Sequence, residues 1–299
     1  MKWQTPLCIT FISALCFASV LAFAFQASHA MSATLPIKSV DKVVSIGGAT
    51  TEILFALGVG DHVIGSDTSS YYPEAAQHTK KVGYMRALST EGVLSLSPDV
   101  VFSAEGAGPI KVLTQLKSVS LPWVTLPEVR SLDVLYENIE KIGRIMSVEK
   151  RAQHLIASLK QDEIQLAQSV SKDKRKPRVL FVMQHTGSPM VAGSNTSADR
   201  IIRLAGGENI AHEIQGYKPL TAEAMVNLNP EWIVSTSFGG RDVNSHDDSK
   251  NGLKSLPSLH LTDAKDESRL IIMDGLLLLG FGPRTIGAAQ QLRSFWYDE

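Results

Sequence analysis

The chain has 299 residues, enough for one large or two medium domains, and 44% of them are hydrophobic, as in an ordinary globular protein. Its formal net charge of −1 gives no support for binding to nucleic acid or to a membrane surface. Both cysteines, Cys8 and Cys16, lie close to the N-terminus.

The N-terminus predicts a signal peptide. Lys2 precedes an apolar run over residues 7–25, and Ser28-His29-Ala30 has the small–x–small pattern that a signal peptidase needs. The run is also long enough to serve as a membrane anchor. The polar residues 26–29 and the lack of flanking Arg or Lys favour cleavage after Ala30. The mature chain would then be exported and soluble, with no thiol for a disulfide, a metal site or a nucleophile.

Strand and helix patterns alternate through the first half in units of about 30 residues. A strand at 41–46 runs into Gly47-Gly48, and Thr50-Thr51-Glu52 opens a helix. A second strand at 62–65 enters a loop that contains Tyr71 and Tyr72 before Pro73. Further strands are expected after Pro98 and at 123–126. The alternation predicts a parallel sheet covered by helices, and ligand sites gather in the loops that follow such strands.

The middle of the chain predicts two amphipathic helices. Apolar residues recur every three to four positions between Leu132 and Val170. Ser147 followed by Glu149 suits a helix start, so we expect a short helix to about Met146 and a long one from 148 to 170. The long helix would measure roughly 34 Å and join two α/β lobes. The alternative is one more core helix in a single domain.

The second half repeats the first. A strand is expected at 178–183, a helix starts at 196–199, another strand lies at 270–273, and the last helix ends near 296. Residues 242–251, rich in Ser and Asp, are expected to form a loop. At a constant offset of 132, Leu88, Glu91, Leu96, Pro98 and Ser103 match Leu220, Glu223, Leu228, Pro230 and Ser235. This repeat indicates two lobes of like topology.

Glu91 and Glu223 occupy equivalent helix starts in the two halves. Stabilisation of the helix dipole explains both residues by itself. A matched pair of carboxylates can also dock onto a two-fold symmetric partner.

The chain as a whole resembles the periplasmic haem-binding proteins of bacterial ABC importers, in the helical-backbone class of solute-binding proteins. The similarity covers essentially all of the mature chain and is carried by these segments: Val43–Ile53, Asp67–Pro73, Gly83–Gly92, Phe181–His185, Tyr217–Leu220 and Gly280–Thr285. It implies an α/β fold of two Rossmann-like lobes with parallel sheets, joined by a long helix, with the ligand cleft between the lobes. The expected divisions are a signal peptide at 1–30, lobes at 31–130 and 177–299, and connecting helices at 131–176.

The resemblance also implies that a tyrosine before a proline ligates ferric haem b, which points to Tyr72, with Tyr71 as the other possibility. A phenolate is a hard anionic donor that suits ferric haem, and because a free phenol has a pKa of about 10, it needs the metal and a nearby cation. Arg86 is the expected cation. His185 is expected as a second axial ligand or as the contact of a second haem. Whether one or two haems bind stays open.

The remaining site residues follow from what haem requires. Met85, Met183, Leu276 and Phe281 are candidates to line an apolar slot, and Lys218, Arg241 and Arg284 to meet the propionates. The similarity further implies that Glu91 and Glu223 dock onto arginines of a permease dimer and that the protein is a periplasmic monomer that delivers its haem to this transporter.

Two other functions remain open. The same fold carries ferric siderophores and cobalamin, which need no tyrosine–iron bond. An exported enzyme is disfavoured because the chain has no Gly-x-Ser-x-Gly motif and its histidines show no metal-ligand spacing.

Overall fold

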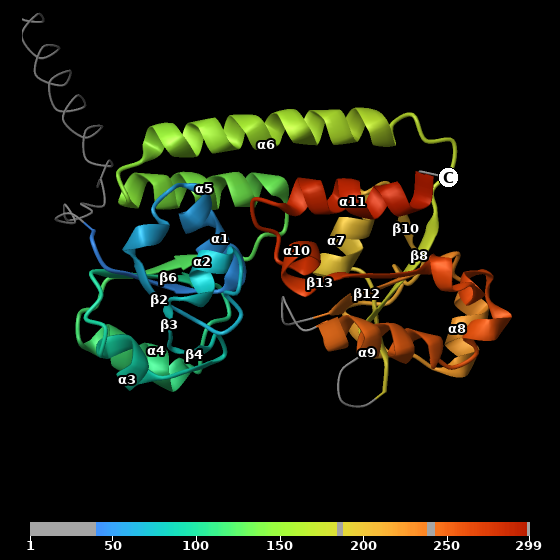
Figure 1. The fold of residues 1–299 in the computed structure, drawn as a ribbon, viewed down its shortest axis with the longest axis horizontal. Coiled ribbons are helices and arrows are strands. Elements are labelled where there is room, and N and C mark those ends of the chain that lie inside the picture. Colours follow the sequence, from blue (N-terminus) through green and yellow to red (C-terminus); the bar gives the residue numbers. More distant parts are fainter. Residues whose placement is uncertain (1–39, 184–187, 238–242, 298–299) are drawn as a thin grey trace, which may run out of the picture. The chain divides into compact units, whose positions relative to one another are not determined.

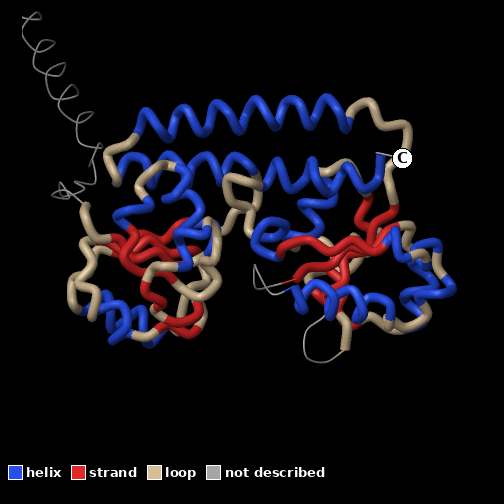
Figure 2. The backbone as a smooth tube through the Cα atoms, viewed as in Figure 1, coloured by secondary structure: helices blue, strands red, loops and turns tan. Residues whose placement is uncertain are grey.

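The computed structural model describes residues 40–183, 188–237 and 243–297, so the expected signal peptide lies outside the described residues. The described residues form an α/β fold with two large sheets, separated in the sequence by a pair of long helices (Figures 1 and 2). None of the helices within the described ranges is long and apolar enough to cross a lipid bilayer.

The first lobe contains a five-stranded parallel sheet in the order β3-β2-β1-β6-β7. Its strands are β1 (Val43–Ile46), β2 (Val63–Ser66), β3 (Lys80–Lys81), β6 (Val100–Ala104) and β7 (Trp123–Leu126). Its helices are α1 (Gly48–Ala56), η1 (Gly60–His62), α2 (Glu74–Gln77), α3 (Thr90–Leu94) and α4 (Ile110–Ser118). A small antiparallel hairpin, β4 (Gly83–Tyr84) and β5 (Ala87–Leu88), precedes α3. The predicted strands and the parallel arrangement are confirmed.

The second lobe repeats this arrangement, because β10, β8, β12 and β13 run parallel in the same order as β2, β1, β6 and β7. Its strands are β8 (Arg178–Met183), β9 (Met190–Ala192), β10 (Glu208–Asn209), β11 (Tyr217–Pro219), β12 (Trp232–Ser237) and β13 (Leu270–Asp274). Its helices are α7 (Ser197–Leu204), α8 (Ala222–Leu228), α9 (Val243–Lys254), η2 (Leu259–Leu261), η3 (Asp263–Lys265), η4 (Glu267–Arg269), α10 (Gly275–Leu279) and α11 (Thr285–Tyr297). The short strands β9 and β11 add antiparallel pairs.

The repeat seen in the sequence has a structural counterpart. Strands β6 and β12 begin at Val100 and Trp232, which lie 132 positions apart. The side chains of Ser89 and Thr221 cap α3 and α8 in the same way, each accepting a hydrogen bond from the backbone N–H three residues later. Equivalent capping residues therefore start equivalent helices in both lobes.

The central helices are α5 (Leu132–Ile145) and α6 (Glu149–Val170), close to the expected ranges. Helix α6 packs against α5 along its N-terminal half and against α11 along its C-terminal half, so it contacts both halves of the chain (Figure 1). Ser147 does not cap α6 as expected; it has a φ of 56° in the turn, and Val148 precedes the helix without a side-chain cap.

Two other local expectations are wrong. Helix α1 begins at Gly48 rather than at Thr50, because the Thr51 N–H already donates to the carbonyl of Gly47. The Ser- and Asp-rich stretch expected as a loop falls largely within helix α9. Ser and Asp are weak helix formers, and here the tertiary structure overrides that local preference.

One hydrophobic core runs through the whole described fold. It joins Ile53 of the first lobe, Ile139 and Leu159 of the central helices, and Ile201 and Trp296 of the second half. Two smaller clusters cover the remaining face of each sheet. The lobes are therefore held by shared apolar packing as well as by the connecting chain.

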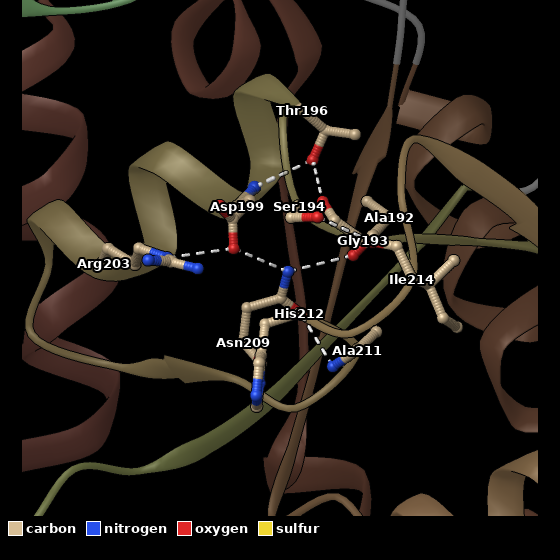
Figure 3. Close-up of polar contacts among 10 residues, drawn as sticks. All are labelled: Ala192, Gly193, Ser194, Thr196, Asp199, Arg203, Asn209, Ala211, His212 and Ile214. Carbon is tan, nitrogen blue, oxygen red and sulfur yellow. Dashed lines mark hydrogen bonds and ion pairs between the residues drawn. The ribbon is translucent and has the colours of Figure 1, made fainter.

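A buried polar network fixes the start of α7 in the second lobe (Figure 3). The Thr196 hydroxyl caps the helix by accepting the N–H of Asp199, and the Asp199 carboxylate accepts hydrogen bonds from Asn209 at 2.9 Å and from Arg203 at 3.1 Å. Asn209 also donates to the carbonyl of Ala192 at the end of β9. These bonds satisfy buried polar atoms and tie α7 to the strands β9 and β10.

Candidate functional site

The loop that carries the two tyrosines is organised by one buried carboxylate. Asp67 is fully buried and accepts hydrogen bonds from the N–H of Gly47 at 2.7 Å, the N–H of Ser69 at 2.9 Å and the hydroxyl of Ser70 at 2.7 Å. The Ser69 hydroxyl donates to the same side chain. Because four donors converge on one carboxylate, the end of β2 and the turn after β1 are held together.

A lysine amine lies inside the same loop. Lys81 donates to the Ser66 hydroxyl at 2.8 Å and to the carbonyls of Ser70 and Ala76, both at 2.9 Å. Burial lowers the pKa of this amine below its usual value, and the nearby Asp67 carboxylate opposes that shift. The backbone on both sides of the tyrosines is thus bonded to one cation.

The hydroxyl of Tyr71 is already hydrogen-bonded, so it is not free to bind a metal. Its hydroxyl donates to the Asp274 carboxylate at 2.9 Å and accepts the N–H of Leu276 at 2.9 Å, so it joins the loop of the first lobe to the start of α10. Asp274 also caps α10 by accepting the N–H of Leu277. Burial, and next the Asp274 charge, raise the pKa of Tyr71 above its usual range. The phenol is therefore neutral and fully engaged.

Replacing Tyr71 with phenylalanine should destabilise the protein by about 1.5 kcal/mol at pH 7, since two partly buried partners lose their bond. The folded-state pKa of Tyr71 is raised, so its contribution is complete below pH 10.0, the ordinary value for a tyrosine, and declines above it as the unfolded phenol ionises. Urea unfolding at pH 7, 9 and 11 should show that the difference in unfolding free energy between wild type and Tyr71→Phe becomes smaller only at pH 11. A gap that stays constant would contradict this assignment.

Tyr72 is the exposed member of the pair. The residue is 40% accessible, and the guanidinium carbon of Arg284 lies 3.3 Å from the centroid of its ring. Arg284 donates through Nη2 to Glu52 at 2.9 Å and through its backbone N–H to the same carboxylate at 3.0 Å. Glu52 lies on α1 with 5% of its side chain exposed. The first lobe thus supplies a buried anion and a phenol, and the second lobe supplies the cation between them.

Glycines permit the lobes to approach here. A Cβ at Gly282 would lie 3.1 Å from the Glu52 carboxylate, and a Cβ at Gly48 would lie 2.5 Å from the side chain of Leu276. A further ion pair joins Glu128 of the first lobe to Arg200 of α7 at 3.6 Å. Side chains larger than hydrogen at Gly48 would push the two lobes apart at the tyrosine loop.

Other expected site residues gather around a cavity of about 430 Å³, a size that suits small-molecule ligands. Met85 and Arg86 line it together with the N-terminal part of α1 and Gly280 of the second lobe. Tyr72 does not line this cavity. Arg86 is exposed and forms no ion pair within the described ranges, so its charge is available to a ligand.

The remaining expected residues within the described ranges do not line this cavity. Met183 is half-buried against the main core, Leu276 lies against Gly48, and Phe281 is buried in the main core with 4% of its surface exposed, so it does not line an open slot. Lys218 is exposed on β11. His185 and Arg241 lie outside the described residues. No group of three or more His, Cys, Asp or Glu side chains suited to a metal ion occurs within the described parts of the chain.

The two repeat glutamates are both exposed in the first turn of their helices, α3 for Glu91 and α8 for Glu223. Leu94 and Val226, each three residues later, are also exposed, at 36% and 39%. Each lobe therefore presents a carboxylate and an aliphatic side chain at equivalent positions.

Two residues of this site were not anticipated from the sequence. In the sequence, Glu52 is only part of a helix start, and no pattern distinguishes Asp274. An acidic residue on an otherwise buried helix is a signal for a buried ion pair. The partner of Glu52 is Arg284, 232 residues away, and no pattern in the sequence near Arg284 predicts the pairing.

Comparisons with known proteins agree with this architecture. Residues 43–275 match the family described as periplasmic binding protein. An uncharacterised ABC transporter substrate-binding lipoprotein, YvrC of Bacillus subtilis (strain 168), is 31% identical over 268 residues, which cover 88% of this chain and 82% of the relative. A vitamin B12-binding protein of Yersinia pestis (strain Pestoides F) is 24% identical over 202 residues, 67% of this chain and 71% of the relative.

Among solved structures, the periplasmic haem-binding protein BhuT in complex with two haems is similar over 86% of this chain and 98% of that chain, with 33% identity and a TM-score of 0.79. The family match covers well over half of the chain, and the Bacillus relative exceeds 30% identity over most of it. This chain belongs to the periplasmic binding protein family, the solute-binding components of ABC transporters.

Proposed function

We propose that this protein is a periplasmic haem carrier that captures ferric haem between its lobes through a tyrosinate–iron bond from Tyr72 and delivers it to an inner-membrane ABC transporter. The observation that carries the proposal is the exposed phenol of Tyr72 beneath the guanidinium of Arg284. Ferric iron accepts a phenolate as a hard anionic ligand, and the adjacent cation offsets its charge. Similarity to the haem-binding protein BhuT supports haem as the ligand.

Tyr72 rather than Tyr71 is the proposed ligand, since the hydroxyl of Tyr71 already bonds Asp274 and Leu276. Arg86, with a free charge beside the cavity, is proposed to meet a propionate or the phenolate. His185, Lys218, Arg241 and Met183 stay candidate haem contacts.

A carrier of cobalamin or of a ferric siderophore is the second candidate, and similarity to the vitamin B12-binding protein supports it. Absorption titration of residues 31–299 with ferric haem, cyanocobalamin and a ferric siderophore separates the candidates. A saturating Soret change with phenolate-to-iron charge-transfer bands would support the haem carrier, and its endpoint would give the number of haems. Saturation by cyanocobalamin or the siderophore alone would contradict it.

Glu91 and Glu223 are proposed to dock the loaded, monomeric carrier onto basic residues of the permease dimer, with Leu94 and Val226 packing beside them. The double variant Glu91→Ala/Glu223→Ala should bind haem like the wild type and lower haem uptake in cells about tenfold, because two charge pairs are lost. The exposed pair Glu137→Ala/Glu140→Ala on α5 is the control. Normal uptake by the first variant would contradict the docking role.

A further inference from the structure

The contact between Arg284 and Tyr72 crosses from one lobe to the other, and its geometry is set by a third residue. Glu52 holds Arg284 twice, through the backbone N–H at 3.0 Å and through Nη2 at 2.9 Å. The carboxylate is almost fully buried, and Gly282 leaves just enough room for the backbone to reach it. The first bond fixes the backbone of Arg284 and the second holds its guanidinium, so the charge has little freedom to turn away from the ring.

The Nε atom of Arg284 shows that hydrogen bonds do not account for the whole position of this guanidinium. It is buried and has no hydrogen-bond partner within the described ranges. Arg284 therefore does not satisfy all of its donors, although Glu52 lies beside it. Its position instead places the face of the guanidinium 3.3 Å from the centroid of the Tyr72 ring.

We propose that Glu52 and Arg284 are positioning residues for Tyr72: the buried carboxylate holds the guanidinium against the face of the ring, and this fixed positive charge stabilises the phenolate that binds ferric iron. The inference rests on the proposed function. It assigns Arg284 to the tyrosine, not to a haem propionate as the sequence suggested.

The physical reason lies in the charge of the ring. A cation over an aromatic face is attracted by the ring electrons, and a phenolate is richer in electrons than a phenol. The attraction therefore grows when the proton leaves and iron binds. Glu52 keeps the arrangement neutral before the ligand arrives, because its charge balances that of Arg284 inside the fold.

The first experiment is a double-variant cycle read by ferric haem titration. Arg284→Met keeps a long side chain against the ring and removes the charge, so it should weaken haem binding about tenfold and shift the phenolate-to-iron charge-transfer band. Arg284→Lys keeps a positive charge, so it should retain part of the haem affinity and show a smaller shift of the charge-transfer band. In a Tyr72→Phe background, Arg284→Met should cause no further loss of affinity.

The outcomes separate this inference from the proposed function. If Arg284→Met weakens haem binding as much in the Tyr72→Phe background as in the wild type, Arg284 acts on haem itself and the inference is overturned. If Tyr72→Phe binds haem unchanged, the tyrosinate of the proposed function fails and the inference falls with it. If Tyr72→Phe is impaired and Arg284→Met is not, only the inference fails.

A second variant distinguishes positioning from simple folding. Arg284→Met leaves the buried Glu52 without its cation, which lowers stability by itself. Adding Glu52→Gln removes that charge, so the double variant should regain most of the lost thermal midpoint. We expect it to keep the weakened haem affinity and the shifted charge-transfer band. If the haem affinity and the charge-transfer band recovered together with the thermal midpoint, the role of Arg284 would be merely structural and the proposal would be overturned.

Discussion

Replacing Tyr72 with phenylalanine is expected to weaken ferric haem binding ~100-fold, about 2.7 kcal/mol, and to abolish the phenolate-to-iron charge-transfer band. The substitution removes only the oxygen, while the ring beneath Arg284 is kept. Because Tyr72 is 40% exposed and its hydroxyl makes no hydrogen bond within the described residues, the fold should lose little stability. Absorption titration gives the affinity, and urea unfolding confirms the fold.

The neighbouring residue supplies the matched control for this prediction. Tyr71→Phe removes the same atom one position earlier, yet that hydroxyl is bonded to Asp274 and Leu276. The control should therefore retain the wild-type haem spectrum while losing stability, the reverse of the Tyr72 result. If Tyr71→Phe lost the charge-transfer band and Tyr72→Phe kept it, Tyr71 and not Tyr72 would be the iron ligand.

The second large effect is expected at Asp67, where Asn should lower the free energy of unfolding by about 3 kcal/mol. The carboxylate is fully buried, and it is the acceptor in each of its hydrogen bonds. An amide in its place presents two N–H donors toward the existing donors, so at least one contact becomes repulsive. The Lys81 amine also loses a nearby negative charge. Urea unfolding measures the loss.

Asp61→Asn is the control for this change, since Asp61 is exposed on η1, only six positions earlier in the chain. It should alter stability by less than about 0.5 kcal/mol. A loss below about 1 kcal/mol in Asp67→Asn would mean that the loop does not depend on this carboxylate. Haem affinity should fall along with stability in Asp67→Asn, because the loop that presents Tyr72 begins at this residue.

The shared hydrophobic core bears on how such a carrier opens. Residues of both lobes and of α5 and α6 belong to one continuous cluster. Opening the lobes widely would expose part of that apolar surface to water, which costs free energy in proportion to the area. Small lobe motions are therefore favoured, and the contacts made by Tyr71 and Arg284 are the ones that such motions would break.

Local patterns in the sequence determined the elements of this protein. Strand and helix periods depend on neighbours within a few positions, so β7, β8 and α5 could be predicted, and the 132-residue repeat indicated that both halves contain equivalent helices. Tyr72 became the candidate ligand only through the resemblance to haem-binding proteins, which its place before Pro73 helps to carry. Helix α9 escaped prediction because its residues have weak local preference for a helix.

Only the tertiary structure decided which partners those residues have. Tyr71 meets Asp274 across 203 positions, and Glu52 meets Arg284 across 232. Neither pairing has a sequence signal, because hydrogen bonds and ion pairs act between atoms that the fold brings within a few ångströms, whatever their distance along the chain. The sequence thus identified two tyrosines and several arginines as candidates. The folded chain engaged one tyrosine in a bond between the lobes and placed Arg284 over the other.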